Sequence, residues 1–425
     1  MLTGSTAASI CDAVDAGFEA QVAFLDRLVR LPSLRCQEAP AQDLMAAAMR
    51  ERGLGVDRFR IDLARIRDLP GFSPVTVSYD DAWNVVGTHR PREAKGRSLI
   101  LNGHIDVVPT GPEDMWSSPP FEPQVKDGWL YGRGAGDMKA GLSANLFALD
   151  ALARAGFRPA GALSLQSVVE EECTGNGALA CLARGHRADA ALITEPSDES
   201  LSPAQVGVMW LQVKVRGLPA HVAYAGSGSN AIEACFPLVA ALHALEHEWN
   251  ARGHPEYASH PHPINFVVSR IEGGDWTSSV PSWCTFDVRV GVFPGQDLAV
   301  ARAEVEAALA AAAARDPFLS RHPPQVVYHG FQAEGYVLQK DTDAQRLLAR
   351  CHASVAGGEL ALRPLTATTD ARFYGLYAGI PALVYGPRSR AIHAFDECVE
   401  LESLRRVTQV VALFIAGWCG LEPAG

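Results

Sequence analysis

A histidine and an aspartate stand where an apolar segment of the sequence ends. The segment LNGHID (101–106) places His104 directly after the apolar residues and Asp106 two positions later. A carboxylate so close to a metal-bound histidine can accept its second ring N–H and fix its tautomer. A polar turn at the end of a strand would use the same residue types, so this segment alone allows both interpretations.

Further acids and a second histidine occupy similar positions later in the chain. Residues 170–172 are three consecutive glutamates that follow the apolar segment 162–169, and Glu195 follows the apolar segment 190–193. His393 lies in the segment AIHAFDE after another strand candidate. Three adjacent acids usually form a solvated run of charge. Their position at the carboxyl ends of strands, where α/β proteins bind ligands, favours a cation site instead.

The glycine-rich segment GRGAGDMKAG (132–141) does not fit a dinucleotide-binding loop. The fingerprint G-x-G-x-x-G requires glycine where this chain has Asp137, and a carboxylate there would repel a pyrophosphate. The segment instead predicts a tight turn that presents Asp137 just before a helix. The alternative is that Asp137 only caps this helix.

These residue types together indicate one kind of chemistry. Imidazoles and carboxylates without a thiolate suit zinc, with cobalt or manganese as substitutes. Two histidines and three carboxylates can hold two ions that share a carboxylate, which is a hydrolytic arrangement. A further glutamate beside them could act as a general base. The residues therefore predict a metal-dependent hydrolase.

Composition excludes several other classes of protein. The 37 lysines and arginines against 48 aspartates and glutamates give a net charge of −11, and no basic stripe indicates nucleic-acid binding. No apolar run approaches the ~20 residues of a membrane helix, and the first residues lack the pattern of a signal peptide. The nine cysteines include no CxxC pair, which argues against a disulfide framework. We expect a cytoplasmic protein that binds neither nucleic acid nor membrane.

The elements that must position these residues fall into two patterns. Apolar strand candidates at 84–88, 98–103, 162–169 and 190–194 alternate with helix candidates at 141–155 and 177–184, and helices at 17–31 and 41–52 precede them. Helix 341–355, strand 381–385 and helix 401–418 continue this style near the end of the chain. The alternation predicts an α/β fold with a mostly parallel sheet, formed by residues 1–206 and 334–425.

Between these two parts the pattern changes to half-exposed strands. Residues 208–216 alternate apolar and polar, and the elements that follow are helix 230–249, strands 264–272 and 283–293, helix 296–315 and strand 325–331. The order β-α-β-β-α-β is the ferredoxin-like arrangement. Residues 207–333 are therefore predicted to form a small domain inserted into the α/β domain.

Seven short motifs occur in the order seen in one family of proteins. They are GHIDVVPTG, GRGAGDMKAG, EEECTGNGA, TEP, GLPAH, PINFVVSRIEGG with FDVRV, and HAFDE. This series resembles the di-zinc family of acetylornithine deacetylase, succinyl-diaminopimelate desuccinylase, aminoacylase and carboxypeptidase G, from residue 17 to 416. The resemblance implies a zinc-binding α/β domain with a ferredoxin-like lid, which also serves for dimerisation.

The resemblance also implies a role for each metal-site residue. Glu171 matches the general base, and the family usually has Asp-Glu-Glu where this chain has three glutamates, so we set the register from Gly175. His104 and Glu195 match the ligands of the first zinc ion, and Asp106 matches the acid that orients His104. Glu172 and His393 match the ligands of the second ion, and Asp137 matches the carboxylate that bridges the two ions.

Four residues outside the metal site match positions that contact the substrate. His221 resembles a histidine that stabilises the oxyanion, acting from the lid of the partner in a homodimer. Asn265 and Arg289 resemble residues that hold the substrate's carbonyl and carboxylate, a role that suits the planar fork of arginine. Thr369 belongs either to the substrate pocket or to a helix cap.

The activity that the resemblance implies is hydrolysis of the amide bond of an N-acyl amino acid or a related N-acyl amine. Two zinc ions per chain would serve it, with Co²⁺ or Mn²⁺ as substitutes. One alternative within the family is a dipeptidase or carboxypeptidase. Another is a binding protein that kept the fold without catalysis, which the presence of all five ligand candidates and the base disfavours.

Overall fold

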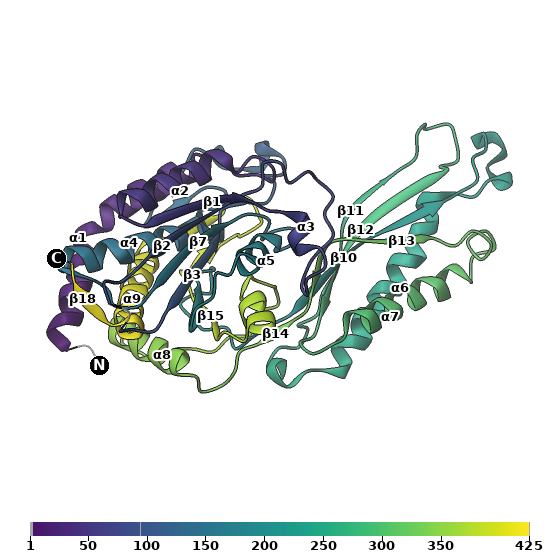
Figure 1. The fold of residues 1–425 in the computed structure, drawn as a ribbon. Helices are drawn as coiled ribbons and strands as arrows, with labels where there is room; N and C mark the ends of the chain where they lie inside the picture. The colour runs from purple at the N-terminus through teal and green to yellow at the C-terminus, as the bar shows by residue number, and fades with distance from the viewer. Residues whose placement is uncertain (1–2, 94, 425) are drawn as a thin grey trace.

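The computed structural model describes residues 3–93 and 95–424 and is built around a six-stranded sheet (Figure 1). The strand order in this sheet is β1-β2-β7-β3-β8-β15. The bounds are β1 Gly55–Arg60, β2 Trp83–His89, β3 Leu99–His104, β7 Leu163–Val168, β8 Ala190–Ile193 and β15 Ala382–Val384.

Four neighbouring strands of this sheet, β7, β3, β8 and β15, run parallel, which confirms the predicted α/β class. Strand β2, at the expected residues 84–88, is an exception in this mostly parallel sheet, because it pairs antiparallel with both β1 and β7. Strand β1 was not predicted. In its sequence, GVDRFR, only Phe59 is buried, so it carries no apolar alternation.

Helices cover both faces of the sheet. Consecutive residues of β3 point to opposite faces. A Cβ on Gly103 would lie 2.8 Å from Met138, just before α4, and 2.9 Å from Leu142 of α4, whereas Asn102 donates a hydrogen bond to Tyr374 of the turn at Phe373–Tyr377. Helices α1, α4 and α9 pack against one another, and α8 packs on α9. The helices of this part are α1 Gly4–Val29, α2 Ala39–Glu51, α3 Leu63–Ile66, α4 Ala140–Arg154, α5 Asn176–Ala183, α8 Asp343–Ala356 and α9 Leu401–Cys419.

Helix α1 begins 13 residues before the expected start at residue 17. Thr3 caps it, because its hydroxyl accepts the backbone N–H of Thr6 at 3.2 Å. Ile10 and Val14, one helical turn apart, are buried against the core and extend its apolar face.

The residues between the two parts of the α/β unit form a sheet of their own. Strands β10 Gly207–Arg216, β11 Phe266–Gly273, β12 Trp283–Val292 and β13 Gln325–Ala333 lie in the order β11-β12-β10-β13, all antiparallel. Helices α6 Ala231–Arg252 and α7 Leu298–Ala313 pack together beside this sheet. The element order is the predicted β-α-β-β-α-β. Figure 1 shows this unit extending away from the six-stranded sheet, and we call it the lid.

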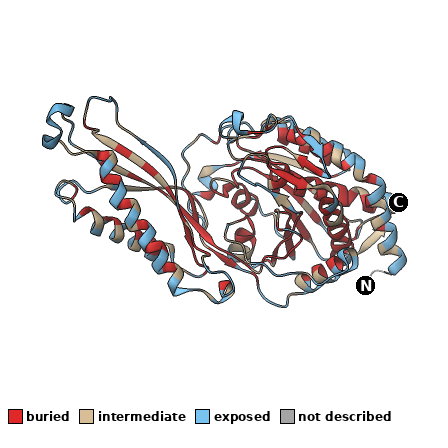
Figure 2. Cartoon of the chain, turned by 180° about the vertical axis from the view of Figure 1, so that it is seen from behind, coloured by how far each residue is buried: buried red, intermediate tan, exposed pale blue. Residues whose placement is uncertain are grey.

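Burial follows the alternation expected for a sheet with one covered face. In β10, Leu211, Val213 and Val215 are buried while Gln212 and Lys214 are partly exposed. Figure 2 shows buried residues concentrated in the six-stranded sheet and its helices, whereas the helices of the lid are exposed on their outer side.

A small four-stranded sheet that the sequence did not predict lies next to the Asp137 segment. Its strands are β16 Ser389–Arg390, β17 Cys398–Glu400, β5 Trp129–Tyr131 and β4 Gln124–Lys126. Strands of two or three residues are too short to show an alternation of apolar and polar side chains in the sequence. The remaining strands form two pairs, β9 Ala204–Gln205 with β14 Tyr336–Val337 and β6 Phe157–Pro159 with β18 Leu421–Pro423. In the described residues we find no helix with the length and apolarity that crossing a membrane requires.

Candidate metal centre

The carboxyl ends of three parallel strands bring the predicted metal-site residues together. His104 is the last residue of β3, Glu171 and Glu172 follow β7, and Glu195 follows β8. Since β7, β3 and β8 are adjacent and parallel, their carboxyl ends lie at one edge of the sheet. The distances between side chains follow from this arrangement.

A first group of ligand atoms surrounds His104. Its Nε2 lies 3.1 Å from Asp137 Oδ1, 3.7 Å from Glu195 Oε1 and 3.8 Å from Glu171 Oε2. His104, Glu171 and Glu195 are all buried. One cation can therefore contact His104 together with two or three carboxylate oxygens.

A second group forms around His393, which belongs to a loop far down the chain. His393 Nε2 lies 3.1 Å from Glu172 Oε2 and 3.4 Å from Asp137 Oδ2. One oxygen of Asp137 thus faces His104 and the other faces His393. This is the geometry of a carboxylate that bridges two cations.

Asp106 orients His104 through its backbone carbonyl and not, as expected, through its carboxylate. The closest partner of His104 Nδ1 is the backbone carbonyl of Asp106 at 2.9 Å, while the carboxylate lies 3.7 Å away. With the Nδ1–H donating to that carbonyl, Nε2 is left free to face Asp137. The carboxylate of Asp106 instead accepts the backbone N–H of Glu172 at 3.1 Å, and so holds the second ligand group.

Glu170, the first of the three consecutive glutamates, points away from this cluster. Arg35 donates two hydrogen bonds to its carboxylate at 2.5 and 2.7 Å, and the Tyr79 hydroxyl donates a third at 2.6 Å. Glu170 also has a positive φ of 69°. Its ion pair with Arg35 therefore fixes the turn that presents Glu171 and Glu172.

A buried ion pair that we did not predict connects the two loops of the cluster. Glu397 accepts the backbone N–H groups of Gly136 and Asp137 at 2.9 and 3.0 Å and binds Arg133 at 2.6 Å. Arg133 also donates to the carbonyl of Ala394, next to His393, at 3.2 Å. The segment HAFDE contained a signal for this role, since its last acid follows His393 by four residues.

The electrostatics of the cluster fit bound cations. Burial raises the pKa of Glu195 to about 7, with His104 acting against this change and Asp137 and Glu172 adding to it. Burial also acts to raise the pKa of Asp137, but hydrogen bonds from His104 and His393 hold it below its usual range. No lysine or arginine of the described residues forms an ion pair with these carboxylates. Cations would stabilise such a concentration of buried acids, and the oxygen and imidazole donors suit zinc.

Asp370 is a further buried acid near the cluster. Neither of its carboxylate oxygens has a hydrogen-bond partner among the described residues. Burial raises the pKa of Asp370 to about 8, with His104 acting against the change and Glu195 adding to it. Asp370 is therefore a further buried carboxyl group whose pKa depends on the charges of the cluster.

A cavity of about 840 Å³ opens from the cluster toward the lid. Glu171, Glu172 and His393 line it on one side, and Arg289 lines it on the other. Burial lowers the pKa of Arg289, whose guanidinium donates to the carbonyl of Thr366 at 3.2 Å. The cavity can hold a small organic molecule between the cluster and the lid.

Three other predicted substrate residues lie outside the lining of this cavity. Asn265 is partly buried just before β11, and its carbonyl accepts the N–H of Gly291 at 3.0 Å. Thr369 makes the contacts of a cap, one of the two roles considered for it, because its hydroxyl donates to Gln205 at 2.7 Å and accepts the N–H of Ala371. The preceding residue, Thr368, faces the cavity instead.

His221 lies far from the metal cluster of its own chain. It is exposed, on the segment after β10, where its Nδ1 accepts the N–H of Ala223 at 3.1 Å and its backbone bridges to Ser279. The cavity lining reaches Leu211, so residues 211–216 of β10, about 17 Å long at the usual rise of a strand, lie between the cavity and the segment of His221.

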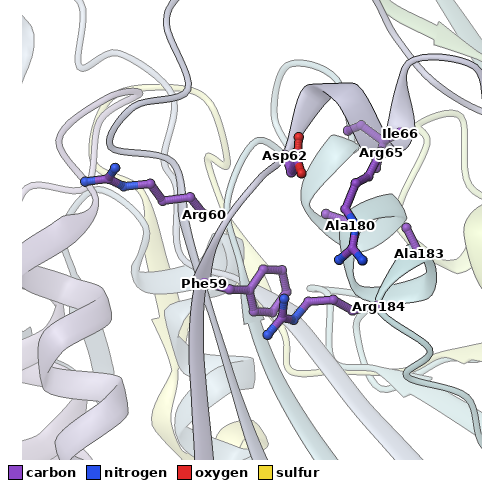
Figure 3. Close-up of a pocket in the computed structure, with 8 residues that line it drawn as sticks. All are labelled: Phe59, Arg60, Asp62, Arg65, Ile66, Ala180, Ala183 and Arg184. Carbon is purple, nitrogen blue, oxygen red and sulfur yellow. The ribbon is translucent and has the colours of Figure 1, made fainter.

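A second hollow has none of the predicted site residues. Figure 3 shows it at the junction of β1, α3 and α5, with the guanidinium of Arg184 beside the ring of Phe59. Its volume is only about 20 Å³. This hollow is too small for a substrate, whereas the cavity beside the metal cluster has both the volume and the functional side chains of a candidate site.

Comparisons with known proteins agree with this geometry. N-formyl-4-amino-5-aminomethyl-2-methylpyrimidine deformylase of Halalkalibacterium halodurans is 32% identical over 348 residues, which cover 77% of this chain and 81% of that protein. Succinyl-diaminopimelate desuccinylase of Marinobacter nauticus is 28% identical over 405 residues, which cover 90% and 94% of the two chains.

Solved structures share the whole fold. The dipeptidase Dug1p of Saccharomyces cerevisiae superposes with a TM-score of 0.81 at 14% identity, over 97% of this chain and 98% of that one. Human carnosine dipeptidase 1 superposes with a TM-score of 0.79, also at 14% identity, over 97% and 99%. The sequence profile of peptidase family M20/M25/M40 matches residues 100–417, which confirms the resemblance. This chain therefore belongs to peptidase family M20/M25/M40.

Proposed function

We propose that this chain removes a small acyl group from an amine or amino acid by hydrolysing the amide bond with two bound metal ions. The observation that carries the proposal is Asp137, whose two oxygens face His104 and His393 separately. The acids Glu171 and Glu172 lie beside this pair at the wall of a substrate-sized cavity. A cluster with two imidazoles, a shared carboxylate and an additional acid suits metal-assisted hydrolysis.

The relatives support deacylation in particular. By their names, the deformylase removes a formyl group and the desuccinylase a succinyl group, both from nitrogen. The dipeptidases among the solved structures are 14% identical and support the fold alone. Dipeptide hydrolysis is the alternative activity, because the same cluster would cleave a peptide bond in the same way.

The side chains divide the work between metal binding and proton transfer. When two zinc ions are bound, they would polarise the acyl carbonyl and make water more acidic, and Co²⁺ or Mn²⁺ could replace them. His104, Asp137 and Glu195 would hold one ion, and Asp137, Glu172 and His393 the other. Burial raises the pKa of Glu171 well above its usual range, with His104 acting against this change and Glu195 adding to it. Glu171 is thereby suited to accept the proton of the attacking water and to pass it to the leaving nitrogen.

Residues 1–206 and 334–425 would form the catalytic domain in this proposal, and residues 207–333 the lid. Arg289 would hold the substrate from the lid, since it lines the cavity opposite the cluster. Asn265 lies beside the same end of β12 and would contact the acyl carbonyl after the lid closes. Closure would also exclude water from the cavity.

Exposed apolar side chains on the lid also support the proposal of a homodimer. Strand β11 is at the edge of its sheet and exposes Val267 and Ile271, at 47% and 52%. Phe236 on α6 and Trp276 on the adjoining loop are 59% and 72% exposed. An unpaired edge strand flanked by exposed apolar side chains favours pairing with a second copy, and closed twofold dimers are the commonest homo-oligomers.

The position of His221 supports a role across such an interface. Within one chain, residues 211–216 of β10 lie between the cavity and the segment of His221, so His221 would need a movement of the lid to reach its own cluster. The second copy would bring its own His221 toward the cluster instead. There it would stabilise the negative charge on the oxygen of the tetrahedral intermediate.

A panel of substrates tests the proposed function. Protein loaded with Zn²⁺ is expected to release free amine from N-formyl, N-acetyl or N-succinyl amines and amino acids faster than from dipeptides. The readout is the amine released, with metal-free protein as the control. Faster cleavage of dipeptides would replace deacylation by the alternative activity, and cleavage of neither class would contradict the proposal.

Mixed dimers test the position of His221. His221→Ala is expected to lower kcat by ~10²–10³-fold, as the loss of an oxyanion donor does, and Glu171→Gln inactivates a different part of the site. When subunits of the two inactive variants exchange, one site in each mixed dimer regains both residues and activity should return. If mixed dimers form, as native mass spectrometry can show, and stay inactive, His221 does not act in trans.

A further inference from the structure

The part of the cavity that lies against the lid is lined in a way that the metal centre does not explain. Besides Arg289 and Arg270, which forms an ion pair with Glu272 at 3.3 Å, the lid contributes the aromatic side chains Trp210, His329 and Phe331 and one acid, Asp287. An acyl group at Glu171 would leave the amine half of the substrate facing these residues. They can therefore select the amine, whereas the cluster acts on the acyl group.

The aromatic residues form a rigid wall. The indole of Trp210 and the ring of Phe331 lie 5.3 Å apart at an angle of 87°, and His329 lies 6.4 Å from the indole at 68°. A Cβ on Gly330 would come within 2.4 Å of Trp210, and Gly330 has a positive φ of 56°. Glycine is thus required where β13 passes the indole, and the backbone at Gly330 packs against Trp210 and restricts its movement. Such a wall favours a flat ring, through offset or edge-to-face contacts.

Asp287 supplies a hydrogen-bond acceptor beside this wall. Its Oδ1 accepts a hydrogen bond from Gln212 at 2.8 Å and lies 3.7 Å from His329 Nε2. The side chain remains 20% exposed, and no lysine or arginine of the described residues forms an ion pair with it. The neighbouring His329 Nε2 has no hydrogen-bond partner among the described residues. A carboxylate held in this way can bind an amino group.

The opposite charges on β12 distinguish two ends of the cavity. Arg289 and Asp287 are two residues apart, so both side chains lie on one face of the strand about 7 Å from each other. Arg289 lies closer to the cluster, since it contacts Thr366 and the neighbouring Thr368 lines the cavity. A group with negative charge therefore fits next to the scissile amide, and a group that donates hydrogen bonds fits further out.

We propose that the lid side of the cavity is a specificity site for the amine half of the substrate, and that it takes a flat aromatic ring carrying an amino group. Trp210, with Phe331 and His329, contacts the ring, and Asp287 accepts a hydrogen bond from the amino group. This inference rests on the proposed deacylase function and names the class of amine that the enzyme releases.

Three matched compounds test the inference with zinc-loaded protein: the N-formyl and N-acetyl derivatives of 4-aminobenzylamine, benzylamine and cyclohexylmethylamine. The ring amino group is expected to raise kcat/KM roughly tenfold over benzylamine, as a hydrogen bond to a charged group does. The aromatic ring is expected to add roughly a further 2- to 10-fold over cyclohexyl. Equal values of kcat/KM for all three compounds would overturn the inference while leaving the proposed function in place.

Variants of Asp287 and Trp210 test which residue causes the preference for the amino group and which causes the preference for the aromatic ring. Asp287→Asn should reduce the ratio between the aminobenzyl and benzyl compounds toward one. Trp210→Leu should reduce the ratio between the benzyl and cyclohexylmethyl compounds, and Trp210→Phe should largely restore it. Glu306→Gln, which removes an exposed acid on α7, is the matched control and should keep both ratios. Ratios that do not change in either Asp287→Asn or Trp210→Leu would contradict the assignment.

Binding of the products keeps the two proposals separate. If none of the three compounds is hydrolysed, calorimetric titration of metal-loaded protein with the free amines still measures the specificity site. Tighter binding of 4-aminobenzylamine than of the other two amines, lost in Asp287→Asn, would support the inference although the deacylase function had failed. Equal binding of the three amines would overturn it.

Discussion

Glu171→Gln is expected to lower kcat by ~10²–10⁴-fold, the usual contribution of a general acid–base group, while the protein keeps two metal ions per chain. Glutamine has almost the same shape as glutamate but cannot accept a proton from water. In the structure, Glu171 lines the cavity, where an attacking water would lie, and Glu195 does not belong to that lining. Turnover of an N-acyl amine and metal content by mass spectrometry measure the two effects separately.

The neighbouring glutamates are the controls for this prediction. Glu172→Gln should weaken binding of one ion, because Glu172 lies 3.1 Å from His393. Glu170→Gln should lower the unfolding temperature, because it weakens the buried ion pair with Arg35 and leaves the metal donors in place. If Glu171→Gln lost an ion and Glu172→Gln lost only turnover, the assigned register of the two acids would be reversed.

Asp137→Ala is expected to have the second largest effect, because it removes the only carboxylate that faces both imidazoles within the described part of the chain. Both ions should bind more weakly, by more than the 10–100-fold that the loss of a supporting residue costs. Glu397→Gln is the matched comparison, since Glu397 binds the backbone of Asp137 without facing the cluster. Its loss of affinity should stay within that 10–100-fold range.

Competition against a chelator gives the affinity of each ion in both variants. Two tightly bound ions in Asp137→Ala would show that the carboxylate does not bridge them. Equal losses in Asp137→Ala and Glu397→Gln would show that Asp137 acts through the shape of its loop.

The parts of the fold that could be predicted from the sequence are those with a clear apolar run or a clear alternation of apolar and polar residues. Apolar runs identified β3, β7 and β8, and the alternation of Leu211, Val213 and Val215 identified β10. Strand β1 could not be found, because only Phe59 of its six residues is buried. The direction of β2 depends on which strand it pairs with, and a buried run of residues does not contain that information.

The metal cluster was largely predictable for a related reason. His104 ends β3, and Glu171 and Glu195 come within three residues of the ends of β7 and β8, so the edge of the sheet at which they meet could be inferred from the chain alone. The roles of Glu170 and Glu397 depend on Arg35 and Arg133, which lie 135 and 264 residues away in the sequence. Such long-range partners leave no local pattern.

The proposed substrate residues were harder to predict than the proposed metal ligands. Thr369 and Thr368 are adjacent and of the same type, and only the path of the chain decides which one caps and which one lines the cavity. Trp210 and Asp287 look like ordinary residues on the half-exposed face of a sheet. Their position in the cavity depends on how the lid meets the catalytic domain.

Titration of metal-free protein with Zn²⁺ tests the central claim most directly. After verified removal of metal, hydrolysis of an N-acyl amine should be lost. Activity should then rise with added Zn²⁺ and level off at two ions per chain, and Glu171→Gln should bind the same two ions without regaining activity. Full activity in metal-free protein, or a wild-type cluster that binds no Zn²⁺, would contradict the account.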